Sequence, residues 1–205
     1  GINMIFKHSN ISYRESEFGK RMIPNQKFWE TIFSIQSGMQ GLGSDFHFSR
    51  YLFKLFSRQN LPYAGFLDIS FMIGNSHEEL PEQFLFELAS GFAGYRRYKA
   101  FATLGQNSII GTKKVTFYIE HTFIGPFADY IDLPFPWDIS AIYNIGWAGD
   151  ADYSQISHED LYSEFGFSLN KIFKLIKFEF VWSGKSIPNS QSFNFVIKVD
   201  EFDIF

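Results

Sequence analysis

Hydrophobic residues recur at every second position along most of this chain. In KVTFYIEHTF (114–123), one set of alternate positions is hydrophobic and the other is largely polar. Successive side chains of a β-strand point to opposite faces, whereas helical spacing would scatter both sets around the helix. The hydrophobic set is Val115, Phe117, Ile119 and Phe123, and the other set is Thr116, Tyr118, Glu120 and Thr122. The pattern predicts an all-β chain whose strands each have one hydrophobic face.

The alternation predicts nine strands. Most of them reach the roughly 9 to 11 residues that a tilted strand needs to cross a bilayer, and exceed the roughly 5 to 6 residues usual in sheets. Soluble sandwiches and ligand-binding barrels show the same alternation, so periodicity alone leaves both classes open. The predicted strands cover residues 3–13, 28–39, 44–56, 63–74, 113–123, 138–147, 160–170, 171–182 and 191–199.

Composition and missing motifs narrow the function classes. The formal net charge of -4 provides no basic surface for phosphates, so we expect no nucleic-acid partner. The chain has no cysteine, which excludes disulfides, thiolate metal sites and cysteine nucleophiles. It also lacks a nucleophile elbow, a Walker-type glycine loop and a His-Glu-x-x-His metal helix. We therefore expect no enzymatic activity, no catalytic residues and no cofactor in these residues.

Two acidic clusters fall in predicted outer loops, at 77–79 and at 158–160. Each contains one histidine and two carboxylates, which could hold a divalent ion or meet a cation-bridged lipopolysaccharide surface. A site built from oxygen ligands needs several converging groups. We interpret both clusters as solvated loop charge and predict no metal site.

The connections between the predicted strands differ strongly in length. Residues 75–112 separate two strands, whereas Asn170 and Lys171 turn directly into the next strand. Long outer loops and short periplasmic turns are typical of outer-membrane barrels. The segment 124–137 falls on the periplasmic side and is long for such a turn. The pattern favours a transmembrane barrel with a long extracellular or lumenal loop at 75–112.

Three successive segments carry a further signal through their order: GLGSDFHFSRYLFKLF (41–56), LPYAGFLDISFMIG (61–74) and LPEQFLFELASGFAGYRRY (80–98). In this order they resemble the BamA-type superfamily of bacterial outer-membrane barrels, also called the surface-antigen superfamily. It includes protein insertases, two-partner secretion translocators and barrels attached to patatin-like phospholipases. Five predicted strands follow the third segment, as in the sixteen-stranded barrel of the superfamily. The resemblance implies that residues 1–205 are the C-terminal portion of one antiparallel transmembrane barrel in the outer membrane of a Gram-negative bacterium.

The third segment resembles the lumenal loop of the superfamily, whose Arg-Gly-Tyr tip docks against acidic residues of the inner wall. In this chain Gly94 and Tyr95 match the tip, but Ala93 stands in the place of the arginine. On the wall, Glu120 stands where the superfamily keeps an inward acid, and Asn144 stands where it commonly has aspartate. The arginine–aspartate pair that the resemblance implies for positions 93 and 144 is therefore absent.

Two arginines follow the tip directly, at Arg96 and Arg97. A buried carboxylate that loses its cation costs on the order of 3 to 5 kcal/mol. We therefore expect Arg96 or Arg97 to dock by pairing with Glu120. The alternative is that both arginines are solvated in an outer loop.

The C-terminal strands carry two further signals. An alternating last strand that ends in an aromatic residue resembles the insertion signal of outer-membrane barrels, and Asp200–Asp203 would lie at the periplasmic rim, where charge costs little. The signal residues are Phe193, Phe195, Ile197, Val199 and Phe205. The strand before it has the predicted lipid-facing residues Ile172, Ile176, Phe178, Phe180 and Trp182. Tryptophans near strand ends are typical of membrane interfaces.

Nine strands form about half of a sixteen-stranded barrel and would leave two unpaired edges, which are costly in hydrocarbon. We expect the remaining strands upstream of Gly1, or from a second copy. One hypothesis is insertion or translocation of proteins, in which a client strand pairs with an exposed edge at a weakly closed seam. The alternatives are the membrane anchor of a patatin-like phospholipase with its catalytic domain upstream, and a soluble lipid-binding β-barrel with hydrophobic faces inward. Expected partners are outer-membrane lipid and lipopolysaccharide and, for the first hypothesis, unfolded client barrels and accessory assembly lipoproteins.

Overall fold

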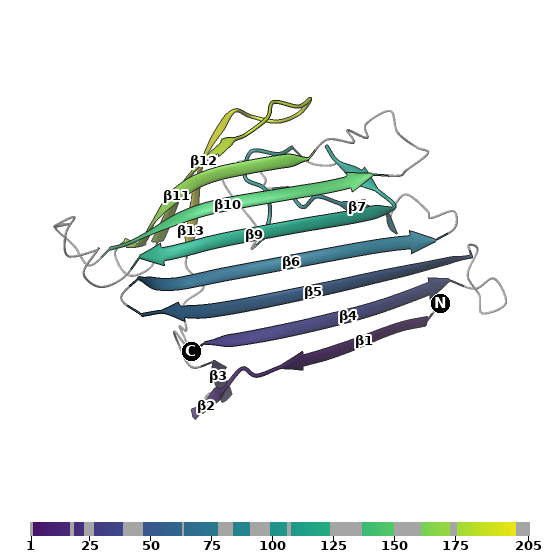
Figure 1. The fold of residues 1–205 in the computed structure, drawn as a ribbon, viewed down its shortest axis with the longest axis horizontal. Coiled ribbons are helices and arrows are strands. Elements are labelled where there is room, and N and C mark those ends of the chain that lie inside the picture. The colour runs from purple at the N-terminus through teal and green to yellow at the C-terminus, as the bar shows by residue number, and fades with distance from the viewer. Residues whose placement is uncertain are drawn as a thin grey trace.

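A nine-stranded antiparallel sheet dominates the computed structural model of the protein (Figure 1). Its strand order is β1-β4-β5-β6-β9-β10-β11-β12-β13, so every strand pairs with its nearest sheet neighbours along the chain. None of the described segments is an α-helix, and none could cross a membrane as a helix. The all-β fold is confirmed. The structure describes residues 2–16, 19–22, 27–38, 47–62, 64–77, 84–90, 99–105, 108–123, 137–149, 161–172 and 176–199.

Each of the nine strands lies close to a predicted range. They are β1 (Ile2–Ser9), β4 (Phe28–Gly38), β5 (Phe48–Leu61), β6 (Gly65–His77), β9 (Lys113–Phe123), β10 (Asp138–Gly149), β11 (Tyr162–Ile172), β12 (Ile176–Ser183) and β13 (Phe193–Val199). The boundary at 170/171 was wrong, because the register shifts between Leu169 and Ile172 and β11 continues to Ile172. Ile172 therefore ends β11 rather than lying in the next strand; it pairs with Ile176 and is 3% exposed.

Two small antiparallel sheets accompany the main sheet. The first pairs β2 (Tyr13–Ser16) with β3 (Gly19–Met22), and the second pairs β7 (Phe86–Glu87) with β8 (Ile110–Gly111). Alternation over two to four residues is too short to distinguish a strand from a loop, so the sequence did not predict them.

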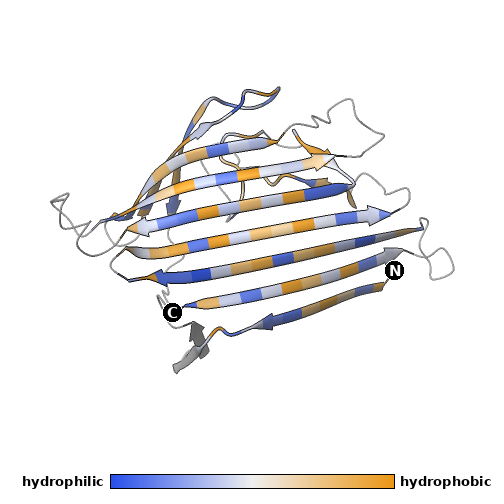
Figure 2. Cartoon of the chain, viewed as in Figure 1, coloured by the Kyte–Doolittle hydropathy of each residue, from blue (hydrophilic) through white to orange (hydrophobic). Residues whose placement is uncertain are grey.

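The main sheet is curved (Figure 1), and hydrophobic and hydrophilic residues alternate along its strands (Figure 2). We define the inner face as the one that packs against residues 84–90 and 99–105, and the outer face as the opposite one. In β10, Asn144 on the inner face is 2% exposed, whereas Tyr143 on the outer face is 44% exposed. The predicted alternation of hydrophobic and polar faces is confirmed along the long strands. Exposed outer-face residues include Phe33, Tyr51, Ile73, Tyr143, Phe165, Phe167, Phe193, Phe195 and Ile197.

The largest hydrophobic core lies on the inner face. Residues from the connection between β6 and β9 pack there against strand residues. The cluster consists of Leu88, Phe101, Leu104, Ile109, Tyr118, Ala148, Tyr162 and Ile187. Within the described residues, β1 and β13 form the two edges of the sheet and do not pair with each other. Closure into a barrel, and the number of strands in it, remain predictions.

Candidate functional site

The candidate site is the part of the inner face, on β9 to β13, where the connection between β6 and β9 docks. Phe101 is completely buried, and its ring centroid lies 5.3 Å from that of Tyr118 and 5.5 Å from that of Tyr162. Gly146 of β10 leaves the space for this ring, because a Cβ atom at Gly146 would lie only 2.6 Å from the Phe101 Cζ. The wall is therefore shaped to receive one aromatic side chain of the connection.

A buried carboxylate, Glu164 of β11, holds the same segment by its backbone. Its Oε2 accepts a hydrogen bond from the Ala102 nitrogen at 2.9 Å. Its Oε1 accepts hydrogen bonds from the nitrogen and the Oγ1 of Thr103, both at 2.6 Å, and the Asn144 amide donates to Oε2 at 3.3 Å. Hydrogen bonds to a charged group are the strong ones, and several of them can stabilise a carboxylate away from water. The Glu164 carboxylate therefore anchors the segment mainly through the backbone atoms of Ala102 and Thr103.

On the other side of the segment, β13 and the residues just before it complete the anchoring. The Gln191 nitrogen donates to the Thr103 carbonyl at 2.8 Å, and the Asn194 side-chain amide donates to the Ala102 carbonyl at 2.6 Å. Residues 102 and 103 thus use both their backbone donors and their acceptors in contacts with the sheet. The segment joins β11 to β13 across the inner face.

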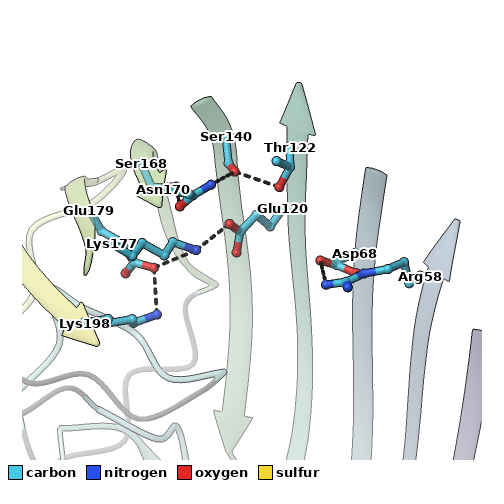
Figure 3. Close-up of polar contacts among 10 residues, drawn as sticks. All are labelled: Arg58, Asp68, Glu120, Thr122, Ser140, Ser168, Asn170, Lys177, Glu179 and Lys198. Atoms are coloured by element: carbon cyan, nitrogen blue, oxygen red, sulfur yellow. Dashed lines mark hydrogen bonds and ion pairs between the residues drawn. The ribbon is translucent and has the colours of Figure 1, made fainter. Parts of the chain in front are cut away.

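A second polar cluster on the inner face is a network of four charged side chains (Figure 3). Lys177 of β12 pairs with Glu120 of β9 and lies 3.2 Å from the Oε1 of Glu179. Lys198 of β13 completes the network, with its Nζ 2.7 Å from the same Glu179 oxygen. The side chain of Glu179 is 1% exposed. Each buried acid in the network thus has a basic partner, as burial requires, and Lys99 adds a further positive charge that acts on Glu120.

Neutral groups continue the polar inner face beyond this network (Figure 3). The Asn170 amide donates to the Ser140 Oγ at 2.6 Å, and the Ser168 hydroxyl donates to the Asn170 Oδ1 at 3.0 Å. The Ser140 and Thr122 hydroxyls lie 2.8 Å apart. Side-chain hydrogen bonds therefore link β9, β10 and β11, and the charged network extends these links to β12. Backbone hydrogen bonds join the same four strands.

Glu120 and Asn144 both lie on the inner face, but they serve different contacts. Glu120 pairs with Lys177, whereas Asn144 donates to Glu164 and lies beside the docked segment. Residues 94–97 lie outside the described residues. The expected pairing of Arg96 or Arg97 with Glu120 therefore stays a prediction.

The proposed C-terminal signal is partly described. Phe193, Phe195 and Ile197 lie on the outer face with 42%, 39% and 48% exposure. Val199 ends β13, and Phe205 lies outside the described residues.

Glu164 and Lys177 were not singled out from the sequence. In LYSEFGFSLN (161–170), Glu164 is the one charged residue on a face that otherwise carries Tyr162, Gly166 and Ser168. An acid on such a face is a usable signal for an inward contact, whereas Glu120 was selected from the resemblance to the superfamily. Its partner could not be predicted, because Ala102 and Thr103 supply backbone atoms.

The described residues contain no group of three or more histidines and carboxylates that could hold a metal ion. Of the acidic clusters at 77–79 and 158–160, the carboxylates at 78–79 and the whole second cluster lie outside the described residues. No protein-family model matches the chain, and no curated protein matches it. The resemblance to the BamA-type superfamily thus remains a prediction.

Proposed function

We propose that this chain is part of a BamA-type outer-membrane β-barrel that inserts or translocates other proteins. The observation that carries the proposal is the outer face, which stays hydrophobic and solvent-accessible across the nine-stranded sheet. Tyr143, Phe165 and Ile197 are 44%, 52% and 48% exposed. Contiguous exposed apolar patches beyond a few hundred Å² are rare on soluble monomers, but lipid-facing strands require them.

The positions of the tryptophans also support strands that cross a membrane. Trp29, the second residue of β4, and Trp137, next to the start of β10, lie towards the end of the sheet at which β5 turns into β6. Trp147 and Trp182 lie near the ends of β10 and β12 at the opposite end of the sheet. Two bands of aromatic residues at the two interfaces are typical of membrane proteins.

The docked segment also agrees with the expected lumenal loop of a BamA-type barrel. Residues 84–90 and 99–105 pack on the inner face, and Phe101 and Thr103 are buried there. The contact chemistry differs from the superfamily pattern, in which an arginine docks against acidic wall residues. In the described segment, Glu164 instead accepts hydrogen bonds from backbone N–H groups. The soluble lipid-binding alternative expects hydrophobic faces to point inward, whereas the inner face here carries the charged network and the buried amides and hydroxyls. The phospholipase hypothesis uses the same barrel and differs only in an upstream domain.

An arginine substitution distinguishes a lipid-facing from a water-facing outer surface. Tyr143 lies in the middle of β10 and is 44% exposed, whereas Phe193 is the first residue of β13 and is 42% exposed. Tyr143→Arg and Phe193→Arg therefore compare two positions along the strands at matched exposure. In a bilayer, arginine costs about 2 to 4 kcal/mol at the midplane and about 0 to 1 near the interface. In water, both substitutions should change the free energy of unfolding by about 0.5 kcal/mol or less. Urea unfolding in lipid vesicles measures the difference, and equal, near-zero effects would contradict the membrane proposal.

The insertion activity requires a separate test. Vesicles that contain the native protein should accelerate the folding of an urea-unfolded outer-membrane barrel relative to empty vesicles, as measured by the fraction of folded client on unheated gels. Vesicles that give no acceleration but release fatty acid from phospholipid would favour the phospholipase alternative.

A further inference from the structure

A small polar cavity lies on the inner face, where the docked segment meets the charged network. Two neighbouring residue pairs of β9 and β10 line one side of it, because Tyr118 pairs with Asn144 and Glu120 pairs with Ile142. The two residues on each strand are two positions apart, so their side chains point to the same face of the sheet. The sheet therefore provides a fixed wall for the cavity.

Three separate polar contacts meet at this cavity. Lys99 lines it from the docked segment, and Asn144, which donates to Glu164, lines it from β10. Glu120 and Glu179 line it from the charged network (Figure 3). The cavity therefore lies between the docked segment, the Glu164 contacts and the charged network.

The cavity has the size of one water molecule. The space that the centre of a water-sized sphere can occupy there is about 20 Å³, and roughly 10 to 15 Å³ is enough for one water. Two of the polar lining residues, Asn144 and Glu179, are 2% and 1% exposed. A ligand in this space would therefore be held by buried polar groups.

The chemistry of the lining favours a neutral ligand that both donates and accepts hydrogen bonds. A cation would lie beside the positive charges of Lys99 and Lys198, and an anion would lie beside the negative charges of Glu120 and Glu179. A water molecule can donate to carboxylate oxygens and accept from an ammonium or amide group. Buried waters typically make about three such hydrogen bonds.

We propose that this cavity binds one water molecule, which bridges the docked segment to the charged network and to Asn144. A bridging water is enthalpically nearly as favourable as a direct hydrogen bond. It would join the three polar contacts into one hydrogen-bonded unit, although their side chains come from distant parts of the chain. The inference does not depend on the proposed insertion activity.

The test is oxidation by a short X-ray pulse of the native protein in uncharged detergent, followed by mass spectrometry. The pulse converts bound water into hydroxyl radicals, which oxidise the side chains beside it. Tyr162 is the internal control, because it is 1% exposed, against 2% for Tyr118, and both rings contact Phe101. Tyr118 lines the cavity and Tyr162 does not. Tyr118 should therefore be oxidised severalfold more than Tyr162, and equal oxidation of the two tyrosines would overturn the proposal.

Two substitutions of Ile142 test whether the oxidation comes from this cavity. Ile142→Phe adds volume at the cavity wall, so the oxidation of Tyr118 should fall to the level of Tyr162. Ile142→Val is the matched control, since it leaves the cavity open and should preserve the difference. Circular dichroism checks that both variants retain their strands. Unchanged oxidation of Tyr118 in folded Ile142→Phe would also overturn the proposal, and if this variant does not fold, the comparison of the two tyrosines in the native protein decides.

Discussion

The Oε1 of Glu164 lies 2.6 Å from the backbone nitrogen of Thr103, which joins β11 to a segment that precedes β9 in the sequence. The contact is buried, and the same oxygen also accepts from the Thr103 hydroxyl. A carboxylate and two consecutive backbone N–H groups thus form the central contact of the docked segment.

We predict that Glu164→Gln releases this segment. The carboxamide provides one acceptor oxygen, and its NH₂ group would face N–H donors, so at least one buried donor loses its partner. The loss of a hydrogen bond to a charged group costs about 1.5 to 3 kcal/mol. Limited proteolysis should cut between residues 84 and 105 faster than in the wild-type protein.

Glu30→Gln is the control for this substitution, because Glu30 pairs with Lys7, whose side chain is 53% exposed. Pairs of that kind contribute about 1 kcal/mol or less. Similar proteolysis of both variants would contradict the anchoring role of Glu164.

The four-charge network predicts strong coupling between Glu120 and Lys177. Lys177→Met leaves the buried Glu179 with Lys198 and leaves Glu120 without this cation, so we expect a loss of about 3 to 5 kcal/mol in the free energy of unfolding. The double variant Lys177→Met/Glu120→Gln should lose clearly less than the sum of the single variants. Denaturant unfolding of all three variants provides the comparison.

An exposed pair provides the reference for that cycle. Lys171 pairs with Asp138 at 2.6 Å, but the lysine side chain is 51% exposed. Lys171→Met should therefore cost about 1 kcal/mol or less. Additive effects of the Glu120 and Lys177 substitutions would show that their pairing does not stabilise the protein.

Gly146 provides a packing prediction. Gly146→Ala places a methyl group within 2.6 Å of the Phe101 ring, and overpacking of this kind costs about 1 to 3 kcal/mol. The smaller ring-free side chain of Phe101→Leu should partly restore stability in the double variant, although alone it is destabilising. Thermal unfolding measures the rescue, and additive losses would mean that the two residues do not meet.

Asp68→Asn tests the ion pair nearest the turn between β5 and β6. The Arg58 Nε and Nη2 donate to the two carboxylate oxygens of Asp68 at 2.6 and 2.7 Å (Figure 3). An asparagine can accept only one of these bonds, so we expect a loss of about 1.5 to 3 kcal/mol. Asp138→Asn should have a smaller effect, since its partner Lys171 is half exposed. Chemical unfolding that ranks the two variants in the reverse order would contradict this prediction.

The strands and their faces were predictable because alternation is a local property. Each long strand carries it in its own residues, as in 114–123, and hydrogen bonding between neighbours then fixes the antiparallel order. The boundary between β11 and β12 was not predictable, because the register shift after Leu169 depends on pairing between the strands.

The contacts across the inner face were only half predictable. Alternation placed Glu120 on the polar face, and the structure confirms this position. It could not identify Lys177 as the partner, because β10 and β11 lie between the two strands. Only the curvature of the sheet brings them together. The Glu164 contact was hidden for a different reason, since its main partners are backbone atoms that carry no sequence signature.

The ion pair between Glu120 and Lys177 therefore fixes the chord of an arc that contains four strands. Flattening the sheet would lengthen this chord and separate the two charges, whereas tighter bending would force their side chains together. The local radius of curvature is thus tied to the charge of two side chains. We therefore expect a substitution at either position to change the curvature of the sheet across these four strands, even though every backbone hydrogen bond between them remains available.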